Sequence, residues 1–374
     1  MSGRYSGGDG RTALWLWLAS ALGPAAKNAG DVLRMYPDPE PLLEECRTQD
    51  LSLMFTPGQL SALRDTRPED FIARMDDCRH QGVGITPWCS EDYPPLLREI
   101  HSPPVVLYWR GDLGAARREL TFAIVGARRP SAYGVEATAR IAAELAQAGV
   151  VLVSGLASGL DSEAHKAALK AGTPTIACIA FGHDKCYPAA HRTLKGLIEK
   201  QGLVLSEYPP GTEIRKEYFL QRNRLIAGLS RGVCVAEARR ASGTMNTVAA
   251  ALEYGRDVFA VPGSIFSPLS EGTNHLLTEG ASPALSGREI LAGYGLKSAV
   301  RQKAEEGSAA APKETQRLSG DARRLRGALG PLPKSLAALC AESGLPAGQA
   351  MAALTELELA GVARALAGRR YVLR

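Results

Sequence analysis

The 374-residue sequence lacks the cysteine pattern of a disulfide-stapled or zinc-binding protein. Its seven cysteines are scattered, and none of them forms a C-x-x-C pair. An odd, unpatterned set of cysteines is typical of reduced thiols, so we expect a cytoplasmic protein with neither a disulfide framework nor a metal site. Long apolar runs are also missing. The best candidate, residues 13–22, is too short to span a bilayer and ends at Gly23-Pro24, which favours a packed helix over a membrane segment or a signal peptide.

A strong charge of one sign is absent as well. The chain has 44 lysines and arginines against 39 aspartates and glutamates, which gives a formal charge of +5. A mildly basic chain permits a polyanionic partner but does not require one. Hydrophobic residues make up 45% of the chain, an ordinary value for a globular protein, and the length predicts two or three domains.

Residues 1–82 are expected to form a helical N-terminal domain, because short apolar-periodic stretches are broken only by glycine and proline. The segment LGPAAKNAGDVL predicts a helix, a glycine-containing turn and a second helix. Helix-hairpin-helix (SAM-like) modules hold a DNA backbone with such turns. Lys27 is the only cation nearby, however, so we favour the alternative of a small helical bundle whose turn merely needs glycine.

Residues 83–296 are expected to combine an ordered, proline-rich connector with a repeated pattern of apolar strand, glycine loop and helix. The connector ends at Gly111 in the strand-like segment VVLYWRG. The expected strands are 122–125, 150–153, 175–180, 204–205, 233–235 and 258–261. Short apolar runs separated by helices are typical of buried parallel strands. The pattern therefore predicts an α/β fold with a Rossmann-like, doubly wound, mostly parallel sheet.

Two segments follow this domain. Residues 297–320 are charged and rich in alanine and serine, which predicts a flexible linker, and residues 321–374 predict three short helices and a hairpin, as in a winged helix. The presumed recognition helix carries Glu356 and Glu358 but no cation, unlike helices that read the major groove. We therefore expect this domain to bind a protein partner, with Arg369 and Arg370 making only a weak DNA contact.

The loops that follow the strands indicate the ligand, because they meet at one edge of an open parallel sheet. The first loop lacks the G-x-G-x-x-G of dinucleotide-binding proteins, and no acidic residue ends the second strand to hold a ribose. Arginines occupy the place of the pyrophosphate, so no nicotinamide cofactor is expected. The candidate ligand-binding residues of this loop are Gly126, Arg128, Arg129 and Ser131.

Two further loops consist of small residues and lead directly into helices. Backbone amides at such helix N-termini bind anions, so each loop is expected to form a seat for a phosphate group. The candidate residues are Ser154, Gly155 and Ala157 in one loop, and Ser242, Gly243 and Thr244 in the other. Several seats along one edge suit a polynucleotide backbone better than a single phosphate ester.

The segment 215–224 interleaves four cations with two aromatic rings. Cations neutralise phosphates, and an exposed ring stacks on an unpaired base. The R-N-R triplet is expected to open a helix, where cations are unfavourable without an anion. The candidates for DNA binding are Lys216, Phe219, Arg222, Asn223 and Arg224. In the alternative interpretation, the arginines pair with Glu207, Glu213 and Glu217, and the rings belong to the core.

Seven motifs in this order resemble the DNA processing protein A (DprA/Smf) family: VGARRPSAYG, SGLASGLDSEAH, SEYPPGT, RNRLIAGLS, ASGT, GRDVFAVPGS and GTNHLLTEGA. The resemblance implies a cytoplasmic homodimer, not an enzyme, that binds and protects single-stranded DNA. It also implies delivery of that DNA to the RecA recombinase in natural transformation and DNA repair. The family's DNA-binding arginine, lysine and aromatic correspond to Arg128, Lys216 and Phe219. Leu220 departs from the family, which commonly has proline at this position. Without the proline ring the loop is less constrained, so the position of Phe219 is not fixed by the resemblance.

A Rossmann-type nucleotide phosphoribohydrolase is the alternative function. Its acid and base would come from Asp161, His165, Glu207 and Glu237. Asp161 and His165 are four residues apart and share one helix face. Such residues more often cap helices or bond to the core, and no nucleophile or metal set accompanies them, so no catalytic residue and no cofactor are expected. The isolated histidines His183, His191 and His275 predict no metal site.

Overall fold

The computed structural model describes residues 8–295, 318–330, 333–366 and 370–373. It divides into two compact units, within residues 1–300 and 301–374. Most of the linker predicted at 297–320 lies outside the described residues, and so does Arg369. None of the described helices is both long and apolar enough to cross a membrane.

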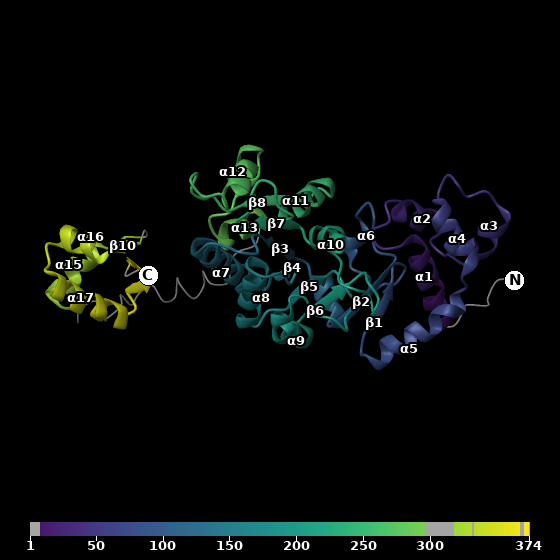
Figure 1. The fold of residues 1–374 in the computed structure, drawn as a ribbon, viewed down its shortest axis with the longest axis horizontal. Coiled ribbons are helices and arrows are strands. Elements are labelled where there is room, and N and C mark those ends of the chain that lie inside the picture. The colour runs from purple at the N-terminus through teal and green to yellow at the C-terminus, as the bar shows by residue number, and fades with distance from the viewer. Residues whose placement is uncertain (1–7, 296–317, 331–332, 367–369, 374) are drawn as a thin grey trace. The chain divides into compact units, whose positions relative to one another are not determined.

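The N-terminal part of the first unit is helical, as predicted (Figure 1). Its elements are α1 Gly8–Leu22, α2 Ala29–Met35, α3 Leu42–Thr48, α4 Pro57–Asp65, η1 Pro68–Phe71 and α5 Ile72–His80. The apolar segment 13–22 lies in α1, where Trp15 and Trp17 are fully buried. The Trp17 indole donates to the carbonyl of Thr66 at 3.2 Å, so this segment is the core of a helical bundle.

A nine-stranded sheet forms the centre of the first unit, in the order β1-β2-β6-β5-β4-β3-β7-β8-β9 (Figure 1). The strands are β1 Gly84–Pro87, β2 Val106–Gly111, β3 Thr121–Val125, β4 Val151–Ser154, β5 Thr175–Ile179, β6 Leu203–Ser206, β7 Gly232–Val235, β8 Asp257–Ala260 and β9 Ser282–Pro283. Neighbours from β6 through β9 pair in parallel. The six predicted strands correspond to β3–β8, which confirms the mostly parallel sheet.

The proline-rich connector also belongs to this sheet. Its strand-like end forms β2, as predicted, whereas β1 and the pairing of both strands with the sheet were not predicted. β1 pairs antiparallel with β2, and β2 pairs antiparallel with β6, with Trp109 opposite Leu205. The prolines lie at the end of β1 or between the two strands, in the segment that holds α6 Pro95–Arg98. Proline is tolerated at a sheet edge, and β1 is the edge strand, so the proline content concealed a genuine β-hairpin.

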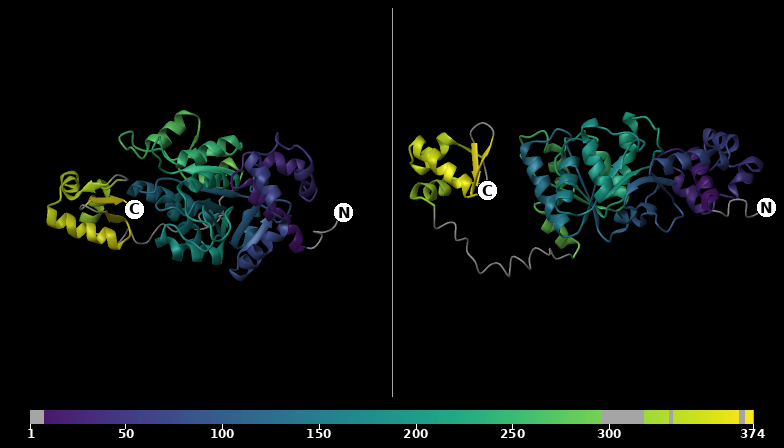
Figure 2. Two further views of the ribbon diagram at one scale, coloured as in Figure 1. Left: turned by 45° about the vertical axis from the view of Figure 1, so that its right-hand side comes forward. Right: turned by 90° about the horizontal axis from the view of Figure 1, so that it is seen from below.

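Helices cover both faces of the sheet (Figure 2). One face carries α7 Ala132–Gln147, α8 Leu160–Lys170, α9 Arg192–Gln201 and α13 Gly287–Gly293, and the other carries α10 Lys216–Gly228, α11 Thr244–Glu253 and α12 Glu271–Thr278. In β3, Phe122 and Ile124 pack toward α7 and α8, whereas Ala123 and Val125 pack toward α10 and α11. Burial on both faces explains why the strands are continuous apolar runs.

The order of the strands creates a switch point beside β3. After β3 the chain adds β4, β5 and β6 on one side, and then crosses over through α10 to place β7 and β8 on the other side. The loops after β3 and β7 therefore lead away from each other. Such a divergence opens a crevice at the carboxyl ends of the strands.

The second unit has the winged-helix arrangement predicted from the sequence. It contains α15 Gly320–Ala328, β10 Lys334–Ser335, α16 Leu336–Ser343, α17 Ala347–Leu359, β11 Ala363–Leu366 and β12 Arg370–Leu373. Its sheet has the order β10-β12-β11. On α17, Leu354 and Leu357 are buried in the core of this unit, whereas Leu359 is exposed.

Phe122 provides a test of the central packing. Its side chain is fully buried in β3, and its ring centroid lies 5.6 Å from that of Phe259. Phe266, by comparison, is an exposed phenylalanine, with 89% of its surface accessible. We expect F122A to lower the free energy of unfolding by about 3–5 kcal/mol, because it removes a buried ring and leaves a cavity. Urea denaturation followed by circular dichroism measures this, with F266A as the matched control. A loss in F122A no larger than that in F266A would contradict this account of the core.

Candidate nucleic-acid interface

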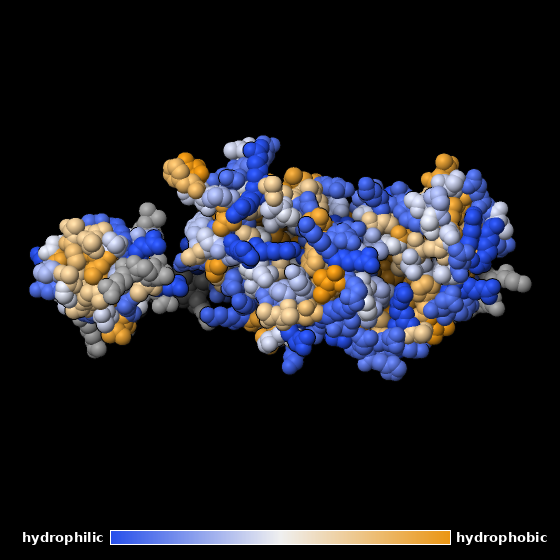
Figure 3. Space-filling model, viewed as in Figure 1, coloured by the Kyte–Doolittle hydropathy of each residue, from blue (hydrophilic) through white to orange (hydrophobic). Residues whose placement is uncertain are grey.

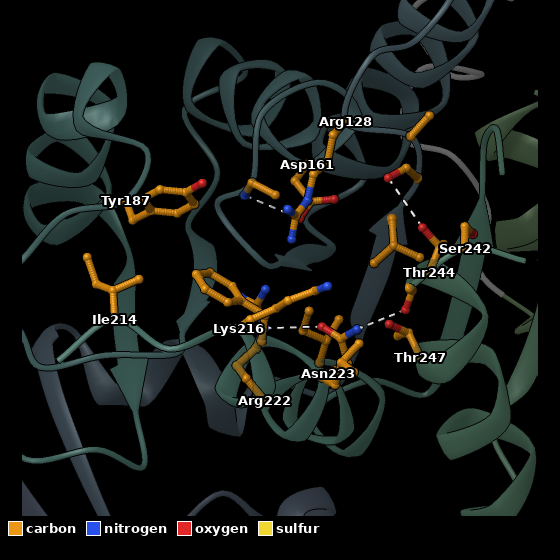
Figure 4. A pocket seen from close by; sticks show the side chains of 18 residues that line it. Arg128, Asp161, Tyr187, Ile214, Lys216, Arg222, Asn223, Ser242, Thr244 and Thr247 are labelled. Carbon is orange, nitrogen blue, oxygen red and sulfur yellow. Dashed lines mark hydrogen bonds between the residues drawn. The ribbon is translucent and has the colours of Figure 1, made fainter. Parts of the chain in front are cut away.

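A cavity of about 690 Å³ lies at the switch point, lined by the loops after β3, β4 and β7 and by the first turns of α10. In the space-filling view, hydrophilic side chains surround this region of α10 and α11, with smaller apolar patches between them (Figure 3). Of the residues predicted to bind a ligand, those that line the cavity are Gly126, Arg128, Ala157, Lys216, Phe219, Arg222, Asn223, Ser242, Gly243 and Thr244 (Figure 4). The structure therefore brings these ten residues together at one cavity.

The remaining predicted residues do not line the cavity. They are Arg129, Ser131, Ser154, Gly155 and Arg224. Arg129 is exposed outside the cavity. The buried hydroxyl of Ser154 donates to the carbonyl of Ile124 at 2.7 Å, so it ties β4 to β3.

The R-N-R triplet does not open a helix, contrary to the prediction. α10 begins at Lys216, so Arg222, Asn223 and Arg224 lie in its second and third turns. No proline or glycine interrupts this segment before Gly228, and Leu220 stands at the position where the family commonly has proline. Both arginines of the triplet are consequently buried in the fold.

Arg222 is buried at the floor of the cavity and is held by backbone carbonyls. One guanidinium nitrogen donates to Gly155 at 2.6 Å and also to Cys178. Burial lowers the pKa of the guanidinium, and the nearby carboxylate of Asp161 opposes that effect. A Cβ at position 155 would lie 2.6 Å from the guanidinium, so any larger residue there would displace it. Arg222 thus supplies positive charge from beneath the surface.

Arg224 points away from the cavity and forms a buried ion pair with Glu207. One guanidinium nitrogen lies 2.5 and 2.6 Å from the two carboxylate oxygens. The same carboxylate accepts the amide of Ala25, in the turn between α1 and α2, at 3.1 Å. Pairing of an arginine with Glu207 was the alternative interpretation, and the structure supports it here. The turn of the suspected helix-hairpin-helix is likewise used to attach the N-terminal helices to the sheet.

The predicted phosphate seat after β4 is already filled by a carboxylate of the protein itself. Asp161 accepts the amides of Gly155 and Ala157, at 3.2 and 3.3 Å. Burial raises the pKa of this carboxyl, while the charge of Arg222 and the two amides act in the opposite direction. These amides are therefore not free to bind an external anion.

A second carboxylate fills the N-terminus of α7. The backbone amide of Ser131 donates to Glu237 at 2.9 Å, and its hydroxyl donates to the same carboxylate at 2.5 Å. Glu237 is only 2% exposed, and a Cβ on Gly134 would lie 2.2 Å from its oxygen. Ser131 therefore acts as the cap of α7 and as the partner of Glu237.

The N-terminus of α11 differs from these two. The hydroxyl of Ser242 is buried and has no hydrogen-bond partner among the described residues. Asn223 donates to the carbonyl of Gly243 at 3.1 Å, and the Thr244 hydroxyl lies 3.4 Å from the carbonyl of Gly126 (Figure 4). This loop is thus held in place by its neighbours while a polar group beside the cavity stays unsatisfied.

Arg128 and Lys216 provide the accessible positive charge. Both are exposed, both line the cavity, and neither forms an ion pair with a carboxylate within the described residues. The Arg128 guanidinium lies 5.6 Å from the centre of the Phe219 ring, a cation–π arrangement. Phe219 is half-buried and also packs against Phe181 and Tyr187, with ring centroids 6.4 and 5.5 Å apart, respectively. The cavity therefore combines unpaired cations with an aromatic ring.

The residues considered for acid–base chemistry are used in structural hydrogen bonds. His165 does not pair with Asp161, because its Nδ1 lies 2.8 Å from the hydroxyl of Thr175 while Asp161 binds amides. Glu207 and Glu237 are bound to Arg224 and Ser131. No cluster of three metal-ligating side chains occurs among the described residues.

Tyr187 and Ile214 are among the cavity residues that the sequence analysis did not predict. Tyr187 comes from the loop between β5 and α9, and Ile214 comes from the loop before α10. Both are large apolar side chains with considerable exposure, 47% and 38%. The Tyr187-Pro188 pair marks a loop in the sequence. Nothing in the sequence, however, indicates that this loop reaches the switch point.

Two buried histidines predict a pH dependence of stability. Burial lowers the pKa of His165 to about 3 and that of His183 to about 3. Each stays neutral in the folded state while the unfolded chain takes up a proton below pH ~6.5, so their contribution to stability is present above that pH and is lost as the pH falls toward 3.

We expect H165Q to reduce the slope of unfolding free energy against pH, between about pH 4 and 6, by roughly 1.4 kcal/mol per pH unit, the equivalent of one proton. Urea titrations across this range measure the slope. H101Q, at an exposed histidine, is the control. An unchanged slope in H165Q would show that His165 takes up its proton equally in both states.

Comparison with known proteins agrees with the motifs. The family model described as DNA recombination-mediator protein A matches residues 84–295, and the DprA winged helix domain model matches residues 309–369. The DNA processing protein DprA of Bacillus subtilis is 42% identical over 212 residues, which cover 57% of this chain and 71% of that protein.

Two solved structures are similar as well. The structure of DNA processing protein A from Streptococcus pneumoniae has a TM-score of 0.60 and 36% identity, and the match covers 75% of this chain and 97% of that chain. The second is a structure that describes the single-stranded DNA binding mode of DNA processing protein A from Helicobacter pylori. It has a TM-score of 0.52 and 33% identity, with coverage of 57% and 95%. The chain therefore belongs to the DNA recombination-mediator protein A (DprA/Smf) family.

Proposed function

We propose that the protein binds single-stranded DNA in the cavity at the switch point. Backbone phosphates would bind to Arg128, Lys216 and the N-terminus of α11, and a base would stack on Phe219. The observation that carries this proposal is the combination of two accessible cations, unpaired within the described residues, with an aromatic ring in one cavity. Such a combination is typical of proteins that bind single strands.

The related Helicobacter pylori protein supports the choice of ligand, because its structure concerns single-stranded DNA binding. The shape of the site supports it too. The bases of a duplex are stacked and paired inside the helix, so they cannot reach a half-buried ring at the floor of a cavity, whereas an unpaired strand can turn its bases inward.

Membership in a family of recombination mediators, which are not enzymes, argues against the phosphoribohydrolase alternative. The carboxylates of Asp161, Glu207 and Glu237 are used by backbone amides, a serine and an arginine. A general base must be free to reach a proton of the substrate. These contacts favour a structural role for all three.

Family membership also supports a wider cellular role. We propose that the protein is a cytoplasmic homodimer that protects incoming or exposed single strands and delivers them to the RecA recombinase in natural transformation and DNA repair. We further propose that the winged-helix unit binds other DNA-processing proteins through α17, on which Met351 and Leu359 are exposed and no lysine or arginine occurs.

Competition binding tests the central proposal. Binding of a labelled oligothymidylate is compared with binding of a duplex of the same length, in the presence and absence of a nucleoside monophosphate. We expect tighter binding of the single strand and no displacement by the monophosphate at concentrations equal in phosphate. Strong displacement by the monophosphate would instead favour the nucleotide-hydrolase alternative.

Removal of one cavity cation should change both affinity and its salt dependence. We expect R128A and K216A each to weaken single-strand binding and to reduce the slope of log K against log salt by about 0.7, the value for one lost phosphate contact on a single strand. K170A, at an exposed lysine at the end of α8 outside the cavity, is the matched control. Unchanged slopes in both cavity variants would refute the assignment.

Removal of the ring should have a different signature. We expect F219A to weaken oligothymidylate binding by about 1–3 kcal/mol, the contribution of one stacked base, without a change in salt slope, because stacking releases no counterions. Fluorescence anisotropy at several salt concentrations measures both quantities. An equal loss of affinity for duplex DNA would argue against a stacking role.

A further inference from the structure

Tyr187 is an exposed aromatic side chain at the cavity with no hydrogen-bonding role in the fold among the described residues. It lines the cavity, its ring is 47% exposed, and its hydroxyl makes no hydrogen bond within the described residues. Tyr218, by contrast, stacks on Tyr208, with ring centroids 4.5 Å apart. The hydroxyl of Tyr133 donates a hydrogen bond of 2.7 Å to the carbonyl of Pro262. Those two tyrosines are held by structural partners, whereas the ring of Tyr187 packs against only one other ring of the described residues, that of Phe219, and leaves 47% of its surface exposed.

The loop that carries Tyr187 is held rigidly from beneath. The ammonium group of Lys195, on α9, is buried and donates to the carbonyls of His183 and Lys185 at 2.5 and 3.0 Å. Asp184 accepts the amide of Gly211 at 2.8 Å, which joins this loop to the loop before α10. The backbone of the loop that precedes Tyr187 is therefore held in place before any ligand binds, and preorganisation of this kind lowers the entropic cost of binding.

The cavity has two chemically distinct sides. Tyr187 and Ile214 lie together on one side, and Ser242 and Thr244 lie on the opposite side (Figure 4). The first side is apolar and exposed, and it adjoins Phe219. The second side presents hydroxyls and the N-terminus of α11. Bases suit the first side and phosphates suit the second.

We propose that Tyr187 and Ile214 form a second nucleobase position next to the one at Phe219, so that two successive bases of a single strand turn toward this side of the cavity. The rings of Tyr187 and Phe219 are 5.5 Å apart and tilted by 58°, so they already contact each other and leave no space for a base between them. Two bases would therefore have to take one ring each. This inference rests on the proposed single-strand binding.

The test compares two ligands of equal charge: an oligothymidylate, and an oligomer of the same length with abasic deoxyribose at every position. Y187L removes the ring but keeps an apolar side chain over the loop. We expect Y187L to weaken oligothymidylate binding about 5- to 150-fold, the equivalent of one stacked base, with an unchanged salt slope and unchanged affinity for the abasic oligomer. Y187F should bind as the unsubstituted protein does, because the hydroxyl has no hydrogen-bond partner in the described part of the chain.

F266A, which removes an exposed ring that does not line the cavity, is the matched control and should bind both oligomers normally. A double-mutant cycle with F219A separates one base from two. Additive losses, on a logarithmic scale, indicate separate bases, whereas a Y187L/F219A double variant no weaker than F219A alone would show that the rings serve a single base and would overturn the proposal.

Normal oligothymidylate binding by Y187L, or an equal loss for the abasic oligomer, would also overturn it. The proposed single-strand binding is judged separately, because it depends on R128A and K216A. If those variants lose affinity while Y187L does not, only the second base position fails.

Discussion

The buried guanidinium of Arg222 is the interaction on which the geometry of the cavity depends. From α10 it reaches across to the carbonyls of Gly155, after β4, and Cys178, in β5. A buried charge is costly unless every donor finds an acceptor, so these elements must close on it in one arrangement. These contacts fix the position of α10. They thereby also fix the backbone positions of Lys216 and Phe219, which lie on the first turns of the same helix.

Two buried carboxylates shape the electrostatics of the cavity. Asp161 and Glu237 occupy the helix N-termini after β4 and β3, where amides and the helix dipole favour negative charge. Because the protein supplies its own anions there, these termini hold the loops together and do not compete for a ligand. Among the described residues that line the cavity, the exposed cations without a carboxylate partner are Arg128 and Lys216.

The first unit connects its parts through one further ion pair. Arg224, on α10, binds Glu207, and Glu207 in turn accepts an amide from the turn between α1 and α2. One helix thus presents Lys216 and Phe219 to the cavity, anchors itself through Arg222, and holds the N-terminal helices through Arg224. Neighbouring residues of a single cationic segment serve separate purposes, because successive positions on a helix point in different directions.

The sequence by itself determined the parallel sheet, the helical N-terminal part, the winged helix and the family. These follow from local patterns: apolar strand length, glycine loops and the collinear motifs. It also identified Arg128, Lys216 and Phe219 as candidates for a shared site. The N-terminal bound of α10 was wrong, since nothing local showed where this helix would begin. The strand-like character of β2 was predicted, but β1 and the antiparallel pairing of both strands with the sheet were missed, since prolines masked the pattern.

Only the tertiary structure decided which charges are accessible. The sequence shows that 215–224 contains four cations, but the partners of those cations come from segments far away along the chain, such as Glu207 for Arg224 and Gly155 for Arg222. The same holds for the amides that Asp161 and Glu237 occupy, and for Tyr187, which reaches Phe219 from another loop. Burial and pairing depend on the packing of distant segments, and packing is a property of the whole fold.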